Sequence, residues 1–158
     1  MSNNNNLKTP QSAIRNPQSD ETPQSEIRNP KLILIIDDSE DDILLTQMVL
    51  RKIRGTIKVE AASSGPAGLA LLSGGNSLPS LVLIDLKMPG MDGLNTLRVI
   101  RADERLCRIP VVVLTHSDLE SDREASYREG ANGFLNKSVN LDQFTELLRN
   151  ELERWISL

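Results

Sequence analysis

Five side chains that could do chemistry stand at the ends of short, mostly apolar segments of the sequence. Asp37 and Asp38 follow the first segment, and Asp85, Thr115 and Lys137 each follow a later one. Clustered carboxylates repel one another, by about 4 kcal/mol per pair at roughly 4 Å and an effective dielectric constant near 20. A hard divalent cation cancels this repulsion, and oxygen ligands without histidine or cysteine suit Mg²⁺. The three carboxylates therefore predict a magnesium site.

The five side chains together are suited to phosphoryl transfer. A carboxylate that attacks phosphorus forms an acyl phosphate. Mg²⁺ and Lys137 would neutralise the oxygens of the transferred group, and Thr115 would supply a hydroxyl donor. Taken singly, Asp85 could be a turn residue before Met88-Pro89-Gly90, and Thr115 and Lys137 ordinary loop residues. Their placement as a set favours the functional interpretation. Three further acids after Asp38 are interpreted as solvated groups at a helix N-terminus: Glu40, Asp41 and Asp42.

The apolar runs predict the strands that position these side chains. Unbroken runs at residues 32–36, 81–84 and 111–114 are typical of strands buried on both faces of a parallel sheet. Two weaker segments, 56–60 and 133–136, suit the sheet edges.

Helical patterns alternate with the strands. The first is predicted at 43–54 after a cap at Ser39, the second at 67–72, and the third is marked by Leu94, Leu97 and Ile100. The fourth is opened by a capping box at Ser117-Asp118-Leu119-Glu120 and stopped at Gly130. The fifth begins at Asn140 and carries an apolar stripe of Leu141, Phe144, Leu148, Leu152 and Trp155. The fourth helix has few apolar residues, so we expect it to pack least and move most.

Five repeats of strand then helix predict a doubly wound α/β fold, since parallel crossovers are right-handed. With the weak strands at the edges, the sheet order is 2-1-3-4-5. Ligands bind such sheets at the carboxyl ends of the strands, near the switch point between strands 1 and 3. The five side chains lie at that edge.

Composition excludes several classes of function. The net charge is -4, which argues against nucleic-acid and membrane-surface partners. One cysteine and one histidine leave no disulfide and no zinc site built from these residues. No apolar run reaches the roughly 18 residues that span a bilayer, and no secretory signal opens the chain. We expect a cytoplasmic protein.

Four segments resemble the receiver domain of bacterial two-component response regulators: residues 32–38, 83–93, 110–115 and 130–137. The resemblance covers about residues 31–157 and implies the flavodoxin-like form of the predicted fold. More narrowly, Arg108-Ile109-Pro110, Lys137-Ser138 and Trp155 resemble the stand-alone regulators paired with cyanobacterial phytochromes.

The resemblance implies a role for each site residue. Asp85 would accept a phosphoryl group from a sensor histidine kinase, which the narrower resemblance implies is of phytochrome type. Mg²⁺ would be held by Asp38, Asp85 and the backbone carbonyl of Lys87, with Asp37 acting through a bound water. Such a protein catalyses its own phosphoryl transfer and hydrolysis and is not a turnover enzyme on an external substrate.

The resemblance also implies a switch. Thr115 would turn to bond the phosphoryl oxygen, Lys137 would pair with it, and Phe134 would turn inward as Thr115 moves. The alternative for Phe134 is a plain core residue of an edge strand.

Two residues depart from the family pattern. Ser138 stands where a proline usually follows the lysine, and His116 stands where the family prefers a small residue. The His116 ring either shields the acyl phosphate or faces solvent. Lys87 and Ser117 would flank the path of attacking water and set the phosphoryl lifetime.

The sequence leaves the output open. The chain stops at Leu158, so we expect a protein contact, or phosphate passed onward in a phosphorelay, rather than an effector domain. A homodimer through the fourth helix, fifth strand and fifth helix is one hypothesis, with Trp155 either an interface anchor or a core plug. Alternatives are a pseudo-receiver that binds partners without phosphate, and a Mg²⁺ phosphatase, for which the usual Asp-x-Asp motif and cap are missing.

The first 30 residues differ from the predicted receiver domain at 31–158. They hold four prolines and no aromatic residue, so we expect a disordered tail. TPQSAIRNP at 9–17 recurs as TPQSEIRNP at 22–30. The repeat is a neutral duplication, a two-copy linear motif, or sequence upstream of the true start codon.

Overall fold

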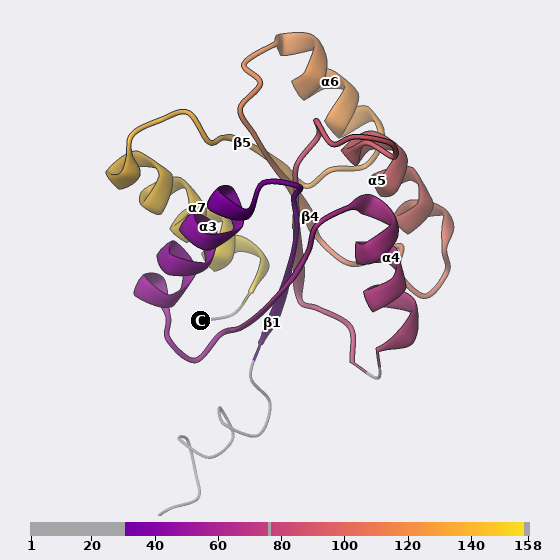
Figure 1. Cartoon of the computed structure of the whole chain (residues 1–158), viewed down its shortest axis with the longest axis horizontal. Helices are drawn as coiled ribbons and strands as arrows, with labels where there is room; N and C mark the ends of the chain where they lie inside the picture. Colours follow the sequence, from indigo (N-terminus) through magenta and orange to yellow (C-terminus); the bar gives the residue numbers. More distant parts are fainter. Residues whose placement is uncertain (1–30, 76, 157–158) are drawn as a thin grey trace, which may run out of the picture. The chain divides into compact units, whose positions relative to one another are not determined.

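The computed structural model describes residues 31–75 and 77–156 of the chain. These residues form a parallel sheet with helices on both faces (Figure 1). The tail at 1–30, its predicted disorder and its duplicated segment lie outside the described residues. No helix in the described part of the chain is long and apolar enough to cross a membrane.

The sheet has the predicted order β2-β1-β3-β4-β5, and every neighbouring pair is parallel. This confirms the doubly wound α/β fold. The strands are β1 Leu32–Ile36, β2 Lys58–Ala62, β3 Leu81–Ile84, β4 Val111–Thr115 and β5 Gly133–Asn136. The helices are α3 Glu40–Ile53, α4 Gly65–Gly74, α5 Gly93–Ala102, α6 Glu120–Arg128 and α7 Leu141–Trp155.

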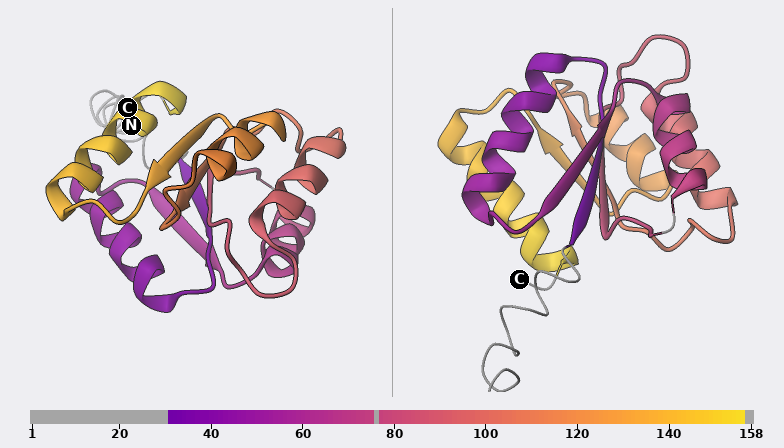
Figure 2. Two further views of the ribbon diagram at one scale, coloured as in Figure 1. Left: turned by 90° about the horizontal axis from the view of Figure 1, so that it is seen from above. Right: turned by 60° about the horizontal axis from the view of Figure 1, so that its bottom comes forward.

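Alternate residues of the central strands fill two hydrophobic layers. In β1, Ile33 and Ile35 pack in a cluster with residues of α3 and α7, whereas Leu34 and Ile36 pack in a second cluster with residues of α4 and α5. Both views of Figure 2 show α3 and α7 on one side of the sheet and α4 and α5 on the other. Burial of both strand faces explains why these segments are unbroken apolar runs.

Several element boundaries differ from the sequence prediction by one to three residues, including both ends of β2 and α4 and the start of α3 at Glu40 rather than residue 43. Strand β2 begins at Lys58 rather than residue 56, because its register pairs Lys58 with Leu32 and so matches the whole of β1. Helix α4 is longer than 67–72, because the Ser64 side chain caps it by accepting from the Ala67 N–H, and a proline in the first turn is compatible with a helix.

The predicted capping box of α6 is wrong. The N-cap residue is Leu119, which makes no side-chain cap hydrogen bond. The Ser117 hydroxyl instead accepts from the Leu119 N–H at 3.2 Å and donates to Asp122 at 2.5 Å. The helix ends at Arg128, close to the predicted stop at Gly130. Gly130 has φ +103°, a left-handed conformation that favours glycine and ends the helical path of the chain.

Helix α7 begins as predicted, with the Asn140 side chain accepting from the Gln143 N–H. Its buried stripe is shorter than predicted, because Leu141 lies in the first turn and is 50% exposed. Trp155 packs against the core and donates to buried Glu151 at 3.0 Å, which supports its interpretation as a core plug.

Candidate acidic site at the strand ends

Backbone hydrogen bonds between strand ends fix the predicted site residues. The Asp37 N–H donates to Ala62 at 3.0 Å, and the Asp85 N–H donates to Ile36 at 3.0 Å. The Lys137 N–H donates to Thr115 at 2.8 Å. The sheet ladder thus continues one residue past the strands and brings the predicted residues to one edge.

Three carboxylates meet there as predicted. Oxygen atoms of Asp37, Asp38 and Asp85 all lie within 4.8 Å of one another. Asp37 and Asp85 are buried, whereas Asp38 is exposed. Asp85 Oδ1 is buried and has no hydrogen-bond partner among the described residues. An orphaned buried acceptor in a cluster of oxygen ligands fits a hard divalent cation.

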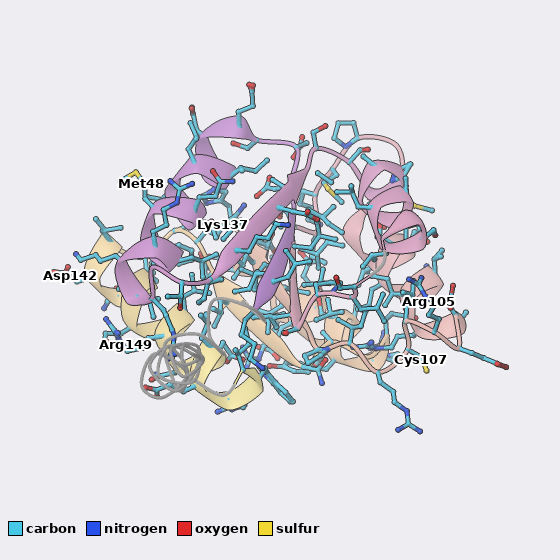
Figure 3. All side chains as sticks on the ribbon, turned by 90° about the horizontal axis from the view of Figure 1, so that it is seen from below. Met48, Arg105, Cys107, Lys137, Asp142 and Arg149 are labelled. Carbon is cyan, nitrogen blue, oxygen red and sulfur yellow. The ribbon has the colours of Figure 1, made fainter. Side chains whose placement is uncertain are left out.

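Lys137 is the positive charge of the site. Its Nζ lies 2.6 Å from Asp37 Oδ2, 2.9 Å from Asp42 Oδ2 and 3.8 Å from Asp85 Oδ2. Its side chain is 3% exposed, between α3 and the sheet in Figure 3. Burial lowers the pKa of Lys137, but the hydrogen bonds to Asp37 and Asp42 and the charges of Asp85 and Asp37 outweigh it, so the pKa is raised. The Lys137 side chain is therefore protonated and positively charged at neutral pH.

The surroundings of the Asp85 carboxyl disfavour its negative charge. Burial raises its pKa most, the charge of Lys137 and the Thr115 hydroxyl oppose this, and the charge of Asp37 adds to it. The net pKa is above the ordinary value. Lys137 and Thr115 therefore only partly compensate the buried charge, and the oxygen Oδ1 stays without a hydrogen-bond partner among the described residues.

Helix α5 packs closely behind Asp85. A side chain at Gly93 would collide with the Asp85 carbonyl oxygen and the Leu86 backbone. The Gly93 N–H donates to Leu86 at 2.9 Å, which closes the intervening loop. Gly90 in that loop has φ +76°. Glycines at these positions let the chain fold back and hold Asp85 in place.

The predicted switch residues differ in burial. Thr115 is fully buried, and its hydroxyl accepts from the Ser117 N–H at 3.3 Å. Phe134 is half-buried, packs against the core and lies 5.8 Å from the Arg123 guanidinium. Phe134 therefore lines the surface beside α6 as well as the core.

The interpretation of Asp42 as a solvated acid is wrong. Its side chain is 20% exposed and contacts Lys137 and His116. Asp42 shares a helix face with buried Thr46 and Val49, at spacings of four and seven residues, and this pattern could have revealed it. The predictions for Glu40 and Asp41, both exposed, agree with the structure.

His116 and Ser138, the two departures from the family pattern, contact each other. His116 Nδ1 lies 3.0 Å from Ser138 Oγ, and Nε2 lies 3.0 Å from Asp42 Oδ2. The ring thus joins α3 to the loop after β5. Neither contact is local in sequence, so no motif predicts them.

Lys87 and Ser117 both contact the carboxylate of Asp122. Lys87 Nζ lies 3.2 Å from Asp122 Oδ2, the atom that accepts from the Ser117 hydroxyl. The Ser117 hydrogen bond lowers the pKa of Asp122, burial opposes this, and Lys87 lowers it further, to below the ordinary value. We call these three side chains the Asp122 clasp.

A family model described as the response regulator receiver domain matches residues 33–149. Response regulator Rcp1 from Synechocystis is 35% identical over 131 residues, which cover 80% of this chain and 89% of Rcp1. This finding agrees with the resemblance inferred from the sequence.

Two solved structures are similar throughout the fold. The crystal structure of the phosphorylated cyanobacterial phytochrome response regulator RcpA gives a TM-score of 0.74 at 34% identity, covering 81% of this chain and 95% of RcpA. The Mn(2+)-bound form of Rcp1 gives a TM-score of 0.67 at 36% identity, covering 82% of this chain and 97% of Rcp1. The predicted fold and the narrower similarity to phytochrome-paired regulators are thereby confirmed.

Proposed function

The chain belongs to the response regulator receiver family, and we propose that it accepts a phosphoryl group on Asp85 from a sensor histidine kinase. The observation that carries this proposal is the Asp85 carboxylate itself. It is buried at the carboxyl end of β3, one of its oxygens is unpartnered among the described residues, and Lys137 lies 3.8 Å away.

The chain's own residues would perform the transfer as follows. An Asp85 oxygen attacks phosphorus, and the bond from phosphorus to the donor's leaving atom breaks as the acyl phosphate bond forms. Lys137 is charged and buried, so its ammonium can pair with an oxygen of the transferred group. The Thr115 hydroxyl, which accepts from the Ser117 N–H, would turn to donate its proton to a phosphoryl oxygen.

The residues present fit a divalent cation. Asp37, Asp38, Asp85 and the backbone carbonyl of Lys87 would hold Mg²⁺, with Asp37 acting through water. When bound, the ion neutralises negative charge on the site and on the transferred group. Asp38 suits a metal-binding role because it is exposed beside two buried carboxylates.

The signal would leave through the face formed by α6, β5 and α7. Movement of Thr115 and Phe134 would alter this face, because β4 and β5 are adjacent strands. Partners would be a downstream phosphotransfer or effector protein, or a second copy of the chain. Similarity to RcpA, described as a phytochrome response regulator, supports a phytochrome-type kinase. We also propose that the protein is cytoplasmic and acts without nucleic-acid or membrane partners.

The test is the intact mass of the protein after incubation with acetyl phosphate and Mg²⁺. We expect the gain of one phosphoryl group, lost when Mg²⁺ is chelated and absent in Asp85→Asn. Asp92→Asn is the matched control, because Asp92 caps α5 through Asn95 and asparagine caps helices equally well. Its mass gain should equal that of the wild type.

No mass gain in folded wild-type protein would reject the proposal. It would favour the pseudo-receiver, which binds a partner through the unmodified face.

A further inference from the structure

We propose that Asp42 is a positioning residue that competes with the phosphoryl site for Lys137, and that His116 weakens this competition by bonding the same Asp42 oxygen. This inference rests on the proposed function of Asp85. The receiver resemblance pairs the Lys137 ammonium with the phosphoryl group alone. It implies no contact of Lys137 with Asp42, and none of Asp42 with His116 or Ser138.

The distances show where Lys137 is held. Its Nζ makes short contacts with Asp37 at 2.6 Å and Asp42 at 2.9 Å, and a longer one with Asp85 at 3.8 Å. An ammonium has three protons, and charge-assisted bonds below 3 Å are the strong ones. Asp42 therefore holds Lys137 towards α3, away from the oxygen that would carry the phosphoryl group.

His116 shares the Asp42 oxygen that binds Lys137. Both Lys137 Nζ and His116 Nε2 approach Asp42 Oδ2, at 2.9 and 3.0 Å. An ionised carboxylate only accepts hydrogen bonds, so Nε2 must donate, and in the neutral ring Nδ1 accepts from the Ser138 hydroxyl. Burial raises the pKa of Asp42, but Lys137 first and then His116 outweigh it, so the pKa is lowered. Asp42 is thus an ionised acceptor with two donors.

This arrangement prepares Lys137 to move. A phosphoryl group on Asp85 would draw the Lys137 ammonium towards its oxygens and away from Asp42. Leaving a largely buried carboxylate without any hydrogen-bond donor costs free energy. Because His116 stays bonded to Oδ2, Asp42 would keep a donor when Lys137 leaves. Asp42 therefore opposes occupation of the site, and His116 lowers that opposition.

The test is the affinity for beryllofluoride, a phosphoryl mimic, measured by calorimetry on the full chain with Mg²⁺. Asp42→Asn should bind about three- to tenfold more tightly than the matched variant Asp41→Asn. Asp41 is the preceding residue in the same helical turn and is exposed, so its variant removes the same charge beside the site. An Asp42→Asn affinity equal to that of Asp41→Asn would overturn the inference.

His116→Ala should have the opposite effect. Asp42 would then have Lys137 as its remaining donor, so beryllofluoride should bind about two- to fivefold more weakly than to the wild type. In the double variant Asp42→Asn/His116→Ala the affinity should equal that of Asp42→Asn. A merely structural role would not give opposite signs, nor a histidine effect that vanishes with Asp42.

The two proposals fail in different ways. If neither the wild type nor Asp41→Asn binds beryllofluoride with Mg²⁺, the proposed function of Asp85 fails. If both bind and His116→Ala binds as tightly as the wild type, the inference about Asp42 and His116 fails alone. His116 is exposed, so its replacement should leave folding intact.

Discussion

Asp85 carries a negative charge where its surroundings oppose one. The carboxyl is buried, Asp37 adds a second negative charge, and one oxygen has no partner among the described residues. Burial therefore raises the pKa of Asp85 despite Lys137. A group whose pKa is higher in the folded than in the unfolded chain favours the unfolded chain when it ionises. The chemistry proposed for the site thus costs stability.

Asp85→Asn should stabilise the metal-free protein. Folded Asp85 keeps its proton above the ordinary pKa of 3.8, so the gain should grow as pH rises beyond 3.8 and level off once the folded carboxyl is ionised. We expect about 1 kcal/mol in the free energy of unfolding at neutral pH, measured by urea denaturation. Mg²⁺ should reduce the difference, because it compensates the wild-type charge. An Asp85→Asn protein less stable than the wild type at pH 7 without metal would contradict this.

The sequence predicts the residues of the site that end strands. Each of them stands at the end of a short, mostly apolar segment that predicts a strand, and parallel strands bring such positions together: Asp37, Asp38, Asp85, Thr115 and Lys137. Side-chain contacts made across different elements leave no such pattern. Sequence reasoning therefore missed the position of Asp42, because its partners, Lys137 and His116, are 95 and 74 residues away.

Among the helices, α6 is the least embedded, as its few apolar residues predict. Within α6 the one buried residue is Ser126. The Asp122 clasp ties its first turns to the loop after β3, since Lys87 reaches Asp122 and Asp122 accepts from Ser117. The clasp places Lys87 and Ser117 in contact with one residue of α6, and both were predicted to flank the path of attacking water.

Lys87→Ala should shorten the life of the phosphoryl group. Removal of the side chain opens the clasp and gives water easier access to Asp85, so we expect about two- to fivefold faster loss of phosphate, followed by intact mass after the donor is removed. Mg²⁺ affinity should stay unchanged, because the Lys87 backbone carbonyl remains. Lys58→Ala is the control, since Lys58 is also exposed but lies on edge strand β2. Equal rates in both variants would refute the role of the clasp.

Element type was more predictable than element boundaries. Hydrophobic runs identify β1, β3 and β4 because both faces of these strands are buried. The start of β2 depends on its register with β1, which is a tertiary property. Likewise, the capping box at Ser117 fits the sequence rule, but in the structure that hydroxyl donates to Asp122.

At the scale of the whole domain, the site and the proposed output surface share β4 and β5. Thr115 ends β4, Phe134 lies in β5, and Val113 pairs with Phe134 in the sheet register. The neighbouring α6 exposes Tyr127 and, at its N-cap, Leu119. A change at Thr115 would therefore reach the surface that carries exposed Leu119 and Tyr127 through one pair of adjacent strands, without rearrangement of the layers.

We predict that occupation of the site promotes homodimerisation through α6, β5 and α7. Leu119 is 57% exposed there, so Leu119→Asp would bring a charge into the contact and should keep the protein monomeric. Leu71→Asp is the matched control, because Leu71 is also an exposed leucine, 43% exposed, but lies on α4, which covers the opposite side of the sheet from α7. In sedimentation velocity with Mg²⁺ and beryllofluoride, the wild type and Leu71→Asp should form dimers, whereas Leu119→Asp should stay monomeric. A wild type that stays monomeric would reject the dimer and leave a heterologous partner as the receiver of the signal, and a Leu119→Asp dimer would place the contact elsewhere.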